Sequence, residues 1–260
     1  MTLLAALAAH LTSRAADPSP IQGGGTAHHA TVRAADSIPQ CYVDNDWICA
    51  YYWKDRRTEL IDATQQHLSI TVISVLLGFA VALPLGLVAR RYRNLESLII
   101  GGTTIVYTIP SLALFSLLLP WTGLTETTVV IGLALYSLTI LVRNVLAGLR
   151  SVPDEVRESA LGLGYGPARL LFKVELPLAL PVIMAGVRVA TVSTVALVTI
   201  GAIVAYGGLG NLLYEAFPSE FKAQIFAASL LCIVLAVVLD IVLVVAQRLM
   251  TPWTRVGRSS

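Results

Sequence analysis

Charged side chains are scarce in this sequence. Asp, Glu, Lys and Arg make up only 13% of the 260 residues, whereas hydrophobic residues make up 56% and the mean hydropathy is +0.75. Soluble proteins carry about 25% charged residues, and a chain of this length cannot supply a polar shell around so much apolar material. The composition therefore excludes an ordinary soluble protein and indicates an integral membrane protein.

Sequence patterns for catalysis are also missing. The chain has no G-x(4)-G-K-[ST] loop to bind nucleotide phosphates, no His and Cys cluster at metal-ligand spacing and no nucleophile triad. The glycines at 162, 164 and 166 do not form G-x-G-x-x-G, so no dinucleotide site is expected. We expect neither an enzyme nor a bound cofactor or metal, and no nucleic-acid partner.

Five apolar runs are long enough to cross the bilayer, which takes about 20 helical residues. The expected spans cover about 68–89, 98–119, 127–148, 177–206 and 223–247, which predicts an all-α membrane protein. Pro110 lies inside the second span and should kink it, because proline removes a backbone hydrogen bond. The kink is either a hinge or a static bend.

Lys and Arg are distributed unevenly among the loops. They follow the first, third and fifth spans, whereas the other two loops between spans hold a single Lys. Because positive residues stay on the cytoplasmic side, this predicts an external N-terminus and an internal C-terminus in a bacterial-type plasma membrane. Basic residues near the N-terminus, such as Arg14 and Arg33, oppose this weakly.

The regions flanking the spans differ in composition. We expect a flexible leader over 1–37, an extracytoplasmic aromatic and cysteine-containing segment over 38–64, a transmembrane domain over 65–250 and a cytoplasmic tail over 251–260. In an oxidising compartment Cys41 and Cys49 form a disulfide; the alternative is two unpaired thiols.

A charged stretch over 151–177 interrupts the apolar sequence between the third and fourth spans. Ser151 is expected to cap a first short helix, Gly164 to end it, and Pro167 to open a second one. Leu176 and Pro177 are then expected to redirect the chain into the fourth span. Periodicity alone leaves open whether this pair of helices rests on lipid headgroups or binds a partner.

The spacing within this stretch resembles a known motif, E-A-A-x(3)-G-x(9)-I-x-L-P. It is similar to the EAA loop of the permease subunits of binding-protein-dependent ABC importers, with conservative departures at two positions, Ser159 and Val174. The matching residues are Glu158, Ser159, Ala160, Gly164, Val174, Leu176 and Pro177. The stretches YTIPSLALFSLLLPWTGL, LYSLTILVRNVLAGL and AYGGLGNLL are similar to the glycine betaine, carnitine and choline group, and the resemblance covers roughly Thr64 to Gln247.

The resemblance implies a five-helix type I importer permease whose cytoplasmic loop couples to a separate ATPase. It implies two ATPase subunits, which hold the ATP and Mg, and an external substrate-binding protein. Two copies of the chain would form the pore, or one copy with a sister permease. The implied solute is a small zwitterion or quaternary ammonium compound such as glycine betaine, choline, carnitine or proline.

Several membrane residues have two interpretations each. By resemblance, Gly207, Gly208 and Gly210 line an external gate; alternatively they only turn the chain. Three tyrosines offer cation–π faces to a passing cation, or serve packing: Tyr107, Tyr136 and Tyr206. The intramembrane charges Arg143, Arg188 and Asp240 mark a solute path, or snorkel or pair with one another.

Two other classes of protein compete with this interpretation. A secondary transporter or channel would need no ATPase, and usually carries internal repeats or broken helices around a midplane site. A membrane scaffold would need only the partner-binding stretch at 151–177.

Overall fold

The regular structure of the described chain is helical. The computed structural model describes residues 39–253, so the predicted leader (1–37) and most of the predicted tail (251–260) lie outside the described residues. Residues 39–253 contain no β-strand, and four of their helices are long and apolar enough to cross a membrane. The prediction of an all-α fold is confirmed.

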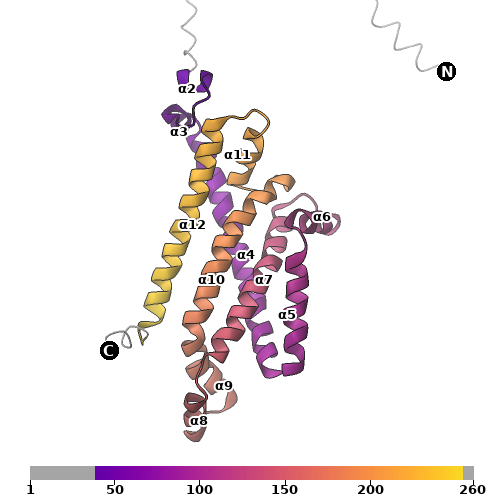
Figure 1. The fold of residues 1–260 in the computed structure, drawn as a ribbon, viewed down its shortest axis with the longest axis vertical. Coiled ribbons are helices and arrows are strands. Elements are labelled where there is room, and N and C mark those ends of the chain that lie inside the picture. The colour runs from indigo at the N-terminus through magenta and orange to yellow at the C-terminus, as the bar shows by residue number, and fades with distance from the viewer. Residues whose placement is uncertain (1–38, 254–260) are drawn as a thin grey trace, which may run out of the picture. The chain divides into compact units, whose positions relative to one another are not determined.

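These four helices correspond to the first, third, fourth and fifth predicted spans. They are α4 (Arg57–Arg91), α7 (Glu126–Arg150), a continuous helix over Pro167–Val204 that contains α10 (Leu176–Val198), and α12 (Lys222–Met250). Helix α4 packs on α7 and α10, and α10 packs on α12 (Figure 1). Helix α4 begins well before residue 68, because Leu60 is buried with Leu209 and Leu212 above the apolar run.

The second predicted span is not one straight helix. It is divided into α5 (Arg93–Thr108) and α6 (Ser111–Thr122), which meet at an angle of 97°. The break lies where the sequence places Pro110: the residue before a proline avoids the helical region, and Ile109 is extended. The number of spans is therefore four, or five if the bent pair is counted as one.

Small residues let the central helices approach closely. A Cβ added to Gly78 of α4 would lie 2.0 Å from Ser137 Oγ of α7, and one added to Gly186 of α10 would lie 2.2 Å from the Cβ of Asn144. Contacts this short leave room only for a hydrogen atom. Glycine is therefore required where α4 and α10 cross α7, as is typical of helix packing in membranes.

An ion pair joins α10 to α12. Arg188 of α10 donates from Nε and Nη2 to the two carboxylate oxygens of Asp240 in α12, at 2.8 and 2.9 Å. Of the two interpretations given to these charges, the structure therefore shows mutual pairing. Arg143 lies apart from them and donates to Thr104 Oγ1 at 2.9 Å.

Replacing Asp240 with alanine is expected to lower the free energy of unfolding, because it leaves the Arg188 guanidinium without its partner on α12. The loss should be modest, since each side chain of the pair keeps 33% exposure. The double variant Arg188→Leu/Asp240→Leu should regain most of the loss. Chemical denaturation in detergent measures both, and equal losses in the two variants would contradict the pairing.

Candidate functional site

The stretch over 151–177, which we call the elbow, forms one end of the bundle (Figure 1). It contains α8 (Asp154–Gly162) and α9 (Pro167–Leu170), separated by a turn. The expected cap at Ser151 is wrong: Ser151 ends α7, with its hydroxyl on the Gly148 carbonyl, and Pro153 is the N-cap of α8. Asp154 in the first turn of α8 suits the positive end of the helix dipole.

Gly164 closes α8 through a left-handed turn. Its φ is +79°, its N–H donates to the Leu161 carbonyl at 2.9 Å, and the next N–H, from Tyr165, donates to the Ala160 carbonyl at 3.1 Å. This pair of bonds is the Schellman motif, which requires positive φ and therefore favours glycine. The stop at Gly164 and the start at Pro167 are both as predicted.

The motif residues differ in exposure. Glu158, Ser159 and Gly164 are exposed, Ala160 is buried, and Val174, Leu176 and Pro177 are half-buried. Several apolar side chains of the elbow also face outward: Leu161 is 53% exposed, Leu163 79% and Phe172 65%. The elbow therefore presents apolar groups beside a carboxylate at a free end of the bundle, which is typical of a protein-binding surface.

The entry into α10 differs from the prediction. The chain does not turn at Leu176 and Pro177; a π-helical turn, η1 (Leu171–Glu175), leads from α9 into α10 within one continuous helix. Pro177 has no N–H to donate within the helix and its ring crowds the preceding turn. The wider π turn accommodates this, so the change of direction occurs only around Gly164.

A buried carboxylate that the motif does not include anchors the elbow. Glu175 in η1 is 5% exposed and accepts two hydrogen bonds from Arg90 at the end of α4, one of them at 2.5 Å from Nη1. Arg157 of α8 also pairs with this carboxylate, with Nε 3.1 Å from Oε1 of Glu175. Arg157 also donates to the Leu149 carbonyl of α7 at 2.7 Å and to Asp154 at 2.8 Å.

This cluster of Arg90, Glu175 and Arg157 connects the elbow to α4, α7 and α10 at once. Sequence reasoning missed it, because its members lie far apart in the chain. The one available signal was the carboxylate of Glu175 between Val174 and Leu176, at the start of the apolar run that becomes α10. These ion pairs and hydrogen bonds tie α8 to the ends of the spanning helices.

The three predicted glycines lie at the opposite end of the bundle from the elbow, around the start of α11 (Leu209–Ala216) (Figure 1). A Cβ on Gly208 would lie 2.7 Å from the backbone N of His67, and one on Gly207 or Gly210 would lie 2.4 Å from backbone atoms of η2 (Thr199–Val204). Gly208 N–H also donates to Gln66 Oε1 at 3.1 Å. The glycines thus hold a tight turn against α4 and η2.

Two of the three predicted tyrosines come together. The rings of Tyr107 and Tyr136 lie 5.7 Å apart, edge to face, and the Tyr136 hydroxyl donates to the Ile109 carbonyl beside Pro110. Both rings line a small cavity with Ser137, Ser193 and Thr194. Tyr206 lies elsewhere, packed on the cluster around Phe115 and Val129.

Residues 39–55, which we call the cap, contain α2 (Gln40–Val43) and α3 (Ala50–Asp55). Cys41 and Cys49 are joined by a disulfide, whereas Cys232 is free and half-buried. Asn45 bonds both the Glu220 carbonyl and the Lys222 N–H at 2.9 Å, which ties the cap to the start of α12. Tyr52 of the cap packs edge to face against Phe221. Burial raises the pKa of the Tyr52 hydroxyl to about 12, so this side chain stays uncharged.

Comparisons with known proteins show the family of the chain. Residues 71–256 match the family described as "Binding-protein-dependent transport system inner membrane component". The chain is 37% identical over 194 residues to the choline transport system permease protein OpuBB of Bacillus subtilis (strain 168), covering 75% of this chain and 89% of that protein. It is 35% identical over 207 residues to the osmoprotectant import permease protein OsmW of Salmonella typhimurium, covering 78% and 96%.

Solved structures share the fold. Inward-facing MetNI, a methionine ABC transporter, matches with a TM-score of 0.63 at 22% identity, over 76% of this chain and 97% of that chain. An amino acid ABC transporter crystallised with histidines matches with a TM-score of 0.64 at 16% identity, over 77% and 98%. The chain therefore belongs to the family of inner membrane components of binding-protein-dependent transport systems, the permeases of ABC importers.

Proposed function

We propose that a separate ATPase drives this permease through the elbow, and that the permease carries a small quaternary ammonium or zwitterionic solute. The observation that carries the proposal is the geometry of α8: a short helix held at a fixed angle by the Gly164 turn, with Leu161 and Leu163 exposed. Glu158 and Gly164 would act in coupling mechanically, with Ala160 as a small contact residue.

The proposal places the elbow in the cytoplasm and the cap outside, as the distribution of Lys and Arg favours. Two ATPase subunits, which hold ATP and Mg, close on ATP and push the two elbows of a permease dimer. A homodimer is the default because one chain supplies one elbow; a heterodimer with a sister permease is the alternative. An external binding protein then delivers the solute to the outward-open pore.

The pore is proposed to open and close by alternating access. The break at Pro110 and the turn around Gly207, Gly208 and Gly210 are the proposed moving parts, because the backbone is already bent at both places. A ligand or partner changes such an equilibrium only through contacts that differ between the two states. The ion pairs of Glu175 provide the connection through which ATPase closure would bias the spanning helices.

The solute class follows from the relatives and from the tyrosine pair. The related permeases are named for choline, for glycine betaine, carnitine and choline, and for osmoprotectants. Several of these solutes carry a quaternary ammonium group, which binds aromatic faces by cation–π attraction. Tyr107 and Tyr136, which meet at the break in the second span, are the proposed aromatic faces on the path.

Replacing Tyr107 with leucine is expected to lower choline uptake between about two- and thirtyfold, since a cation–π contact contributes about 0.5–2 kcal/mol. Tyr107→Phe keeps the aromatic face and should retain most of the uptake. Initial uptake rates at saturating binding protein measure the effect. Equal losses in the leucine and phenylalanine variants would remove Tyr107 from the proposed path.

The partner is tested by purifying the tagged chain from its native membrane in mild detergent and identifying its companions by mass spectrometry. A P-loop ATPase should be recovered with the wild type and depleted with Leu163→Asp at the elbow. The matched control is Leu124→Asp, an equally radical change at an exposed loop residue outside the elbow. A well-folded wild type that brings no ATPase in several detergents would favour the alternative, a secondary transporter or channel.

A further inference from the structure

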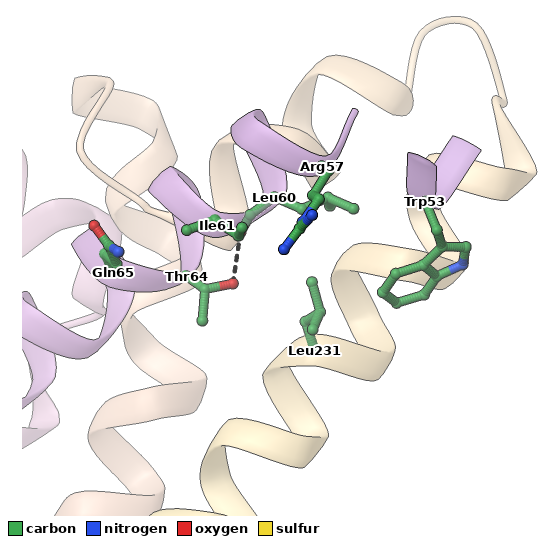
Figure 2. Close-up of a pocket in the computed structure, with 7 residues that line it drawn as sticks. All are labelled: Trp53, Arg57, Leu60, Ile61, Thr64, Gln65 and Leu231. Atoms are coloured by element: carbon green, nitrogen blue, oxygen red, sulfur yellow. Dashed lines mark hydrogen bonds between the residues drawn. The ribbon is translucent and has the colours of Figure 1, made fainter. Parts of the chain in front are cut away.

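A crevice opens between α3 of the cap, α4 and α12. It has a volume of about 450 Å³ (Figure 2). The residues that line it are Trp53, Arg57, Leu60, Ile61, Thr64, Gln65 and Leu231. None of these residues has a role in the function proposed above.

The walls of the crevice are mainly apolar: Leu60, Ile61 and Leu231 line it, and Leu60 is buried. Its polar side chains are those of Arg57, Thr64 and Gln65. The one hydroxyl, that of Thr64, donates to the Leu60 carbonyl of its own helix at 2.6 Å and offers no further proton (Figure 2). These walls suit a hydrocarbon chain rather than a polar ligand.

The cation at the mouth of the crevice is Arg57. Arg57 forms no ion pair with another described residue, whereas the adjacent Arg56 pairs with both Asp55 and Glu59, at 3.7 and 3.0 Å. Figure 2 shows the Arg57 guanidinium on the side of Leu231, and Trp53 on the α3 side of the same crevice. Arg57 begins the spanning helix α4 and Trp53 precedes it in α3; arginine and tryptophan beside the end of a span are typical of the headgroup level.

We propose that this crevice binds one glycerophospholipid, with its phosphodiester on Arg57 and one acyl chain between α4 and α12. Arginine is well suited to this contact, because its fork of donors matches phosphate oxygens. Only 11% of the most apolar part of α12 is buried within the chain, so the surface that continues the crevice also needs an apolar cover. A lipid supplies the anion and the hydrocarbon together.

Protein occupants fit the crevice less well. Leu231 lies nine residues after Lys222 at the start of α12, about 13 Å along the helix at 1.5 Å per residue, inside the fifth apolar run, where hydrocarbon is the expected neighbour. A symmetric contact between two copies centred here would bring the two Arg57 side chains together, and like charges repel. The proposal does not depend on coupling to an ATPase.

The test places the photo-crosslinker p-benzoylphenylalanine at Ile61 in the full chain, purified with its complex and inserted in nanodiscs of phosphatidylethanolamine and phosphatidylglycerol. After irradiation, intact mass spectrometry should show an adduct with the mass of a phospholipid. Arg57→Gln should lower the adduct yield about fivefold, the effect of one cation near a lipid surface. Arg56→Gln, which removes a paired arginine one residue away, should leave the yield unchanged, and Arg57→Lys should keep most of it.

Three results would overturn the proposal. The first is an adduct with a second copy of the chain, which would make the crevice a subunit interface. The second is an adduct with another polypeptide. The third is a lipid adduct whose yield is the same in Arg57→Gln and the wild type, because such a lipid would only be part of the surrounding bilayer.

Discussion

Replacing Glu175 with glutamine is expected to destabilise the protein by about 3 kcal/mol and to uncouple solute uptake from ATP hydrolysis. The change keeps the shape of the side chain but leaves Arg90 and Arg157 without their buried carboxylate. Removing one partner of a buried pair costs about 3–5 kcal/mol, and we take the lower end because the two arginine side chains keep 20% and 23% exposure. The free energy of unfolding measures the first effect.

The second effect distinguishes a mechanical link from a purely structural one. In the assembled importer, Glu175→Gln should still support ATP hydrolysis but should lower the solute taken up per ATP by at least about tenfold, which corresponds to about 1.4 kcal/mol. Glu96→Gln is the matched control, since Glu96 pairs with Arg150, whose side chain is 53% exposed. Exposed pairs contribute about 0–1 kcal/mol. A parallel fall in hydrolysis and uptake would show that Glu175 only holds the fold together.

Replacing Gly164 with valine is expected to lower ATP-driven uptake about tenfold while the chain still inserts in the membrane. The backbone at this residue has φ of +79°, which costs a residue with a side chain about 1–2 kcal/mol, and a β-branched one more. An added Cβ would meet no atom within 4 Å, so the loss comes from the turn and not from a clash. The elbow would then populate other angles for α8.

Gly162→Val provides the control, because Gly162 lies two residues away, is also exposed, has no positive φ, and its Cβ would meet nothing within 4 Å. It should lose less than half of the uptake. Membrane insertion is followed by the amount of full-length chain in washed membranes. Equal losses in the two variants would show that any bulk on this surface is harmful and that the turn itself is not required.

Features that depend on a few adjacent residues could be predicted from the sequence. The apolar runs over 127–148 and 223–247 lie within α7 and α12, whose ends differ from them by a few residues, because a long apolar run is the signal for a spanning helix. The stop at Gly164 was predicted because the left-handed turn is a property of glycine. The expected cap at Ser151 was wrong because α7 runs on through Arg150, so Ser151 ends a helix and does not begin one.

Features that depend on contacts between distant residues could not be predicted. The start of α4 at Arg57 depends on packing around Leu60, and the 97° bend at Pro110 is accompanied by a bond from Tyr136 to the carbonyl of Ile109. The sequence showed a proline there, but not the bond across 27 residues that satisfies the freed carbonyl. The pairing of Glu175 with Arg90 spans 85 residues and has no local pattern at all.

The most direct test of the account is uptake of radiolabelled choline or glycine betaine into proteoliposomes that contain this permease, its ATPase and its binding protein. The account predicts uptake that requires ATP on the side of the elbow and binding protein on the side of the cap. Ionophores that collapse ion gradients should leave this uptake unchanged. Uptake that proceeds without ATP when a sodium or proton gradient is imposed would contradict the account and identify a secondary transporter.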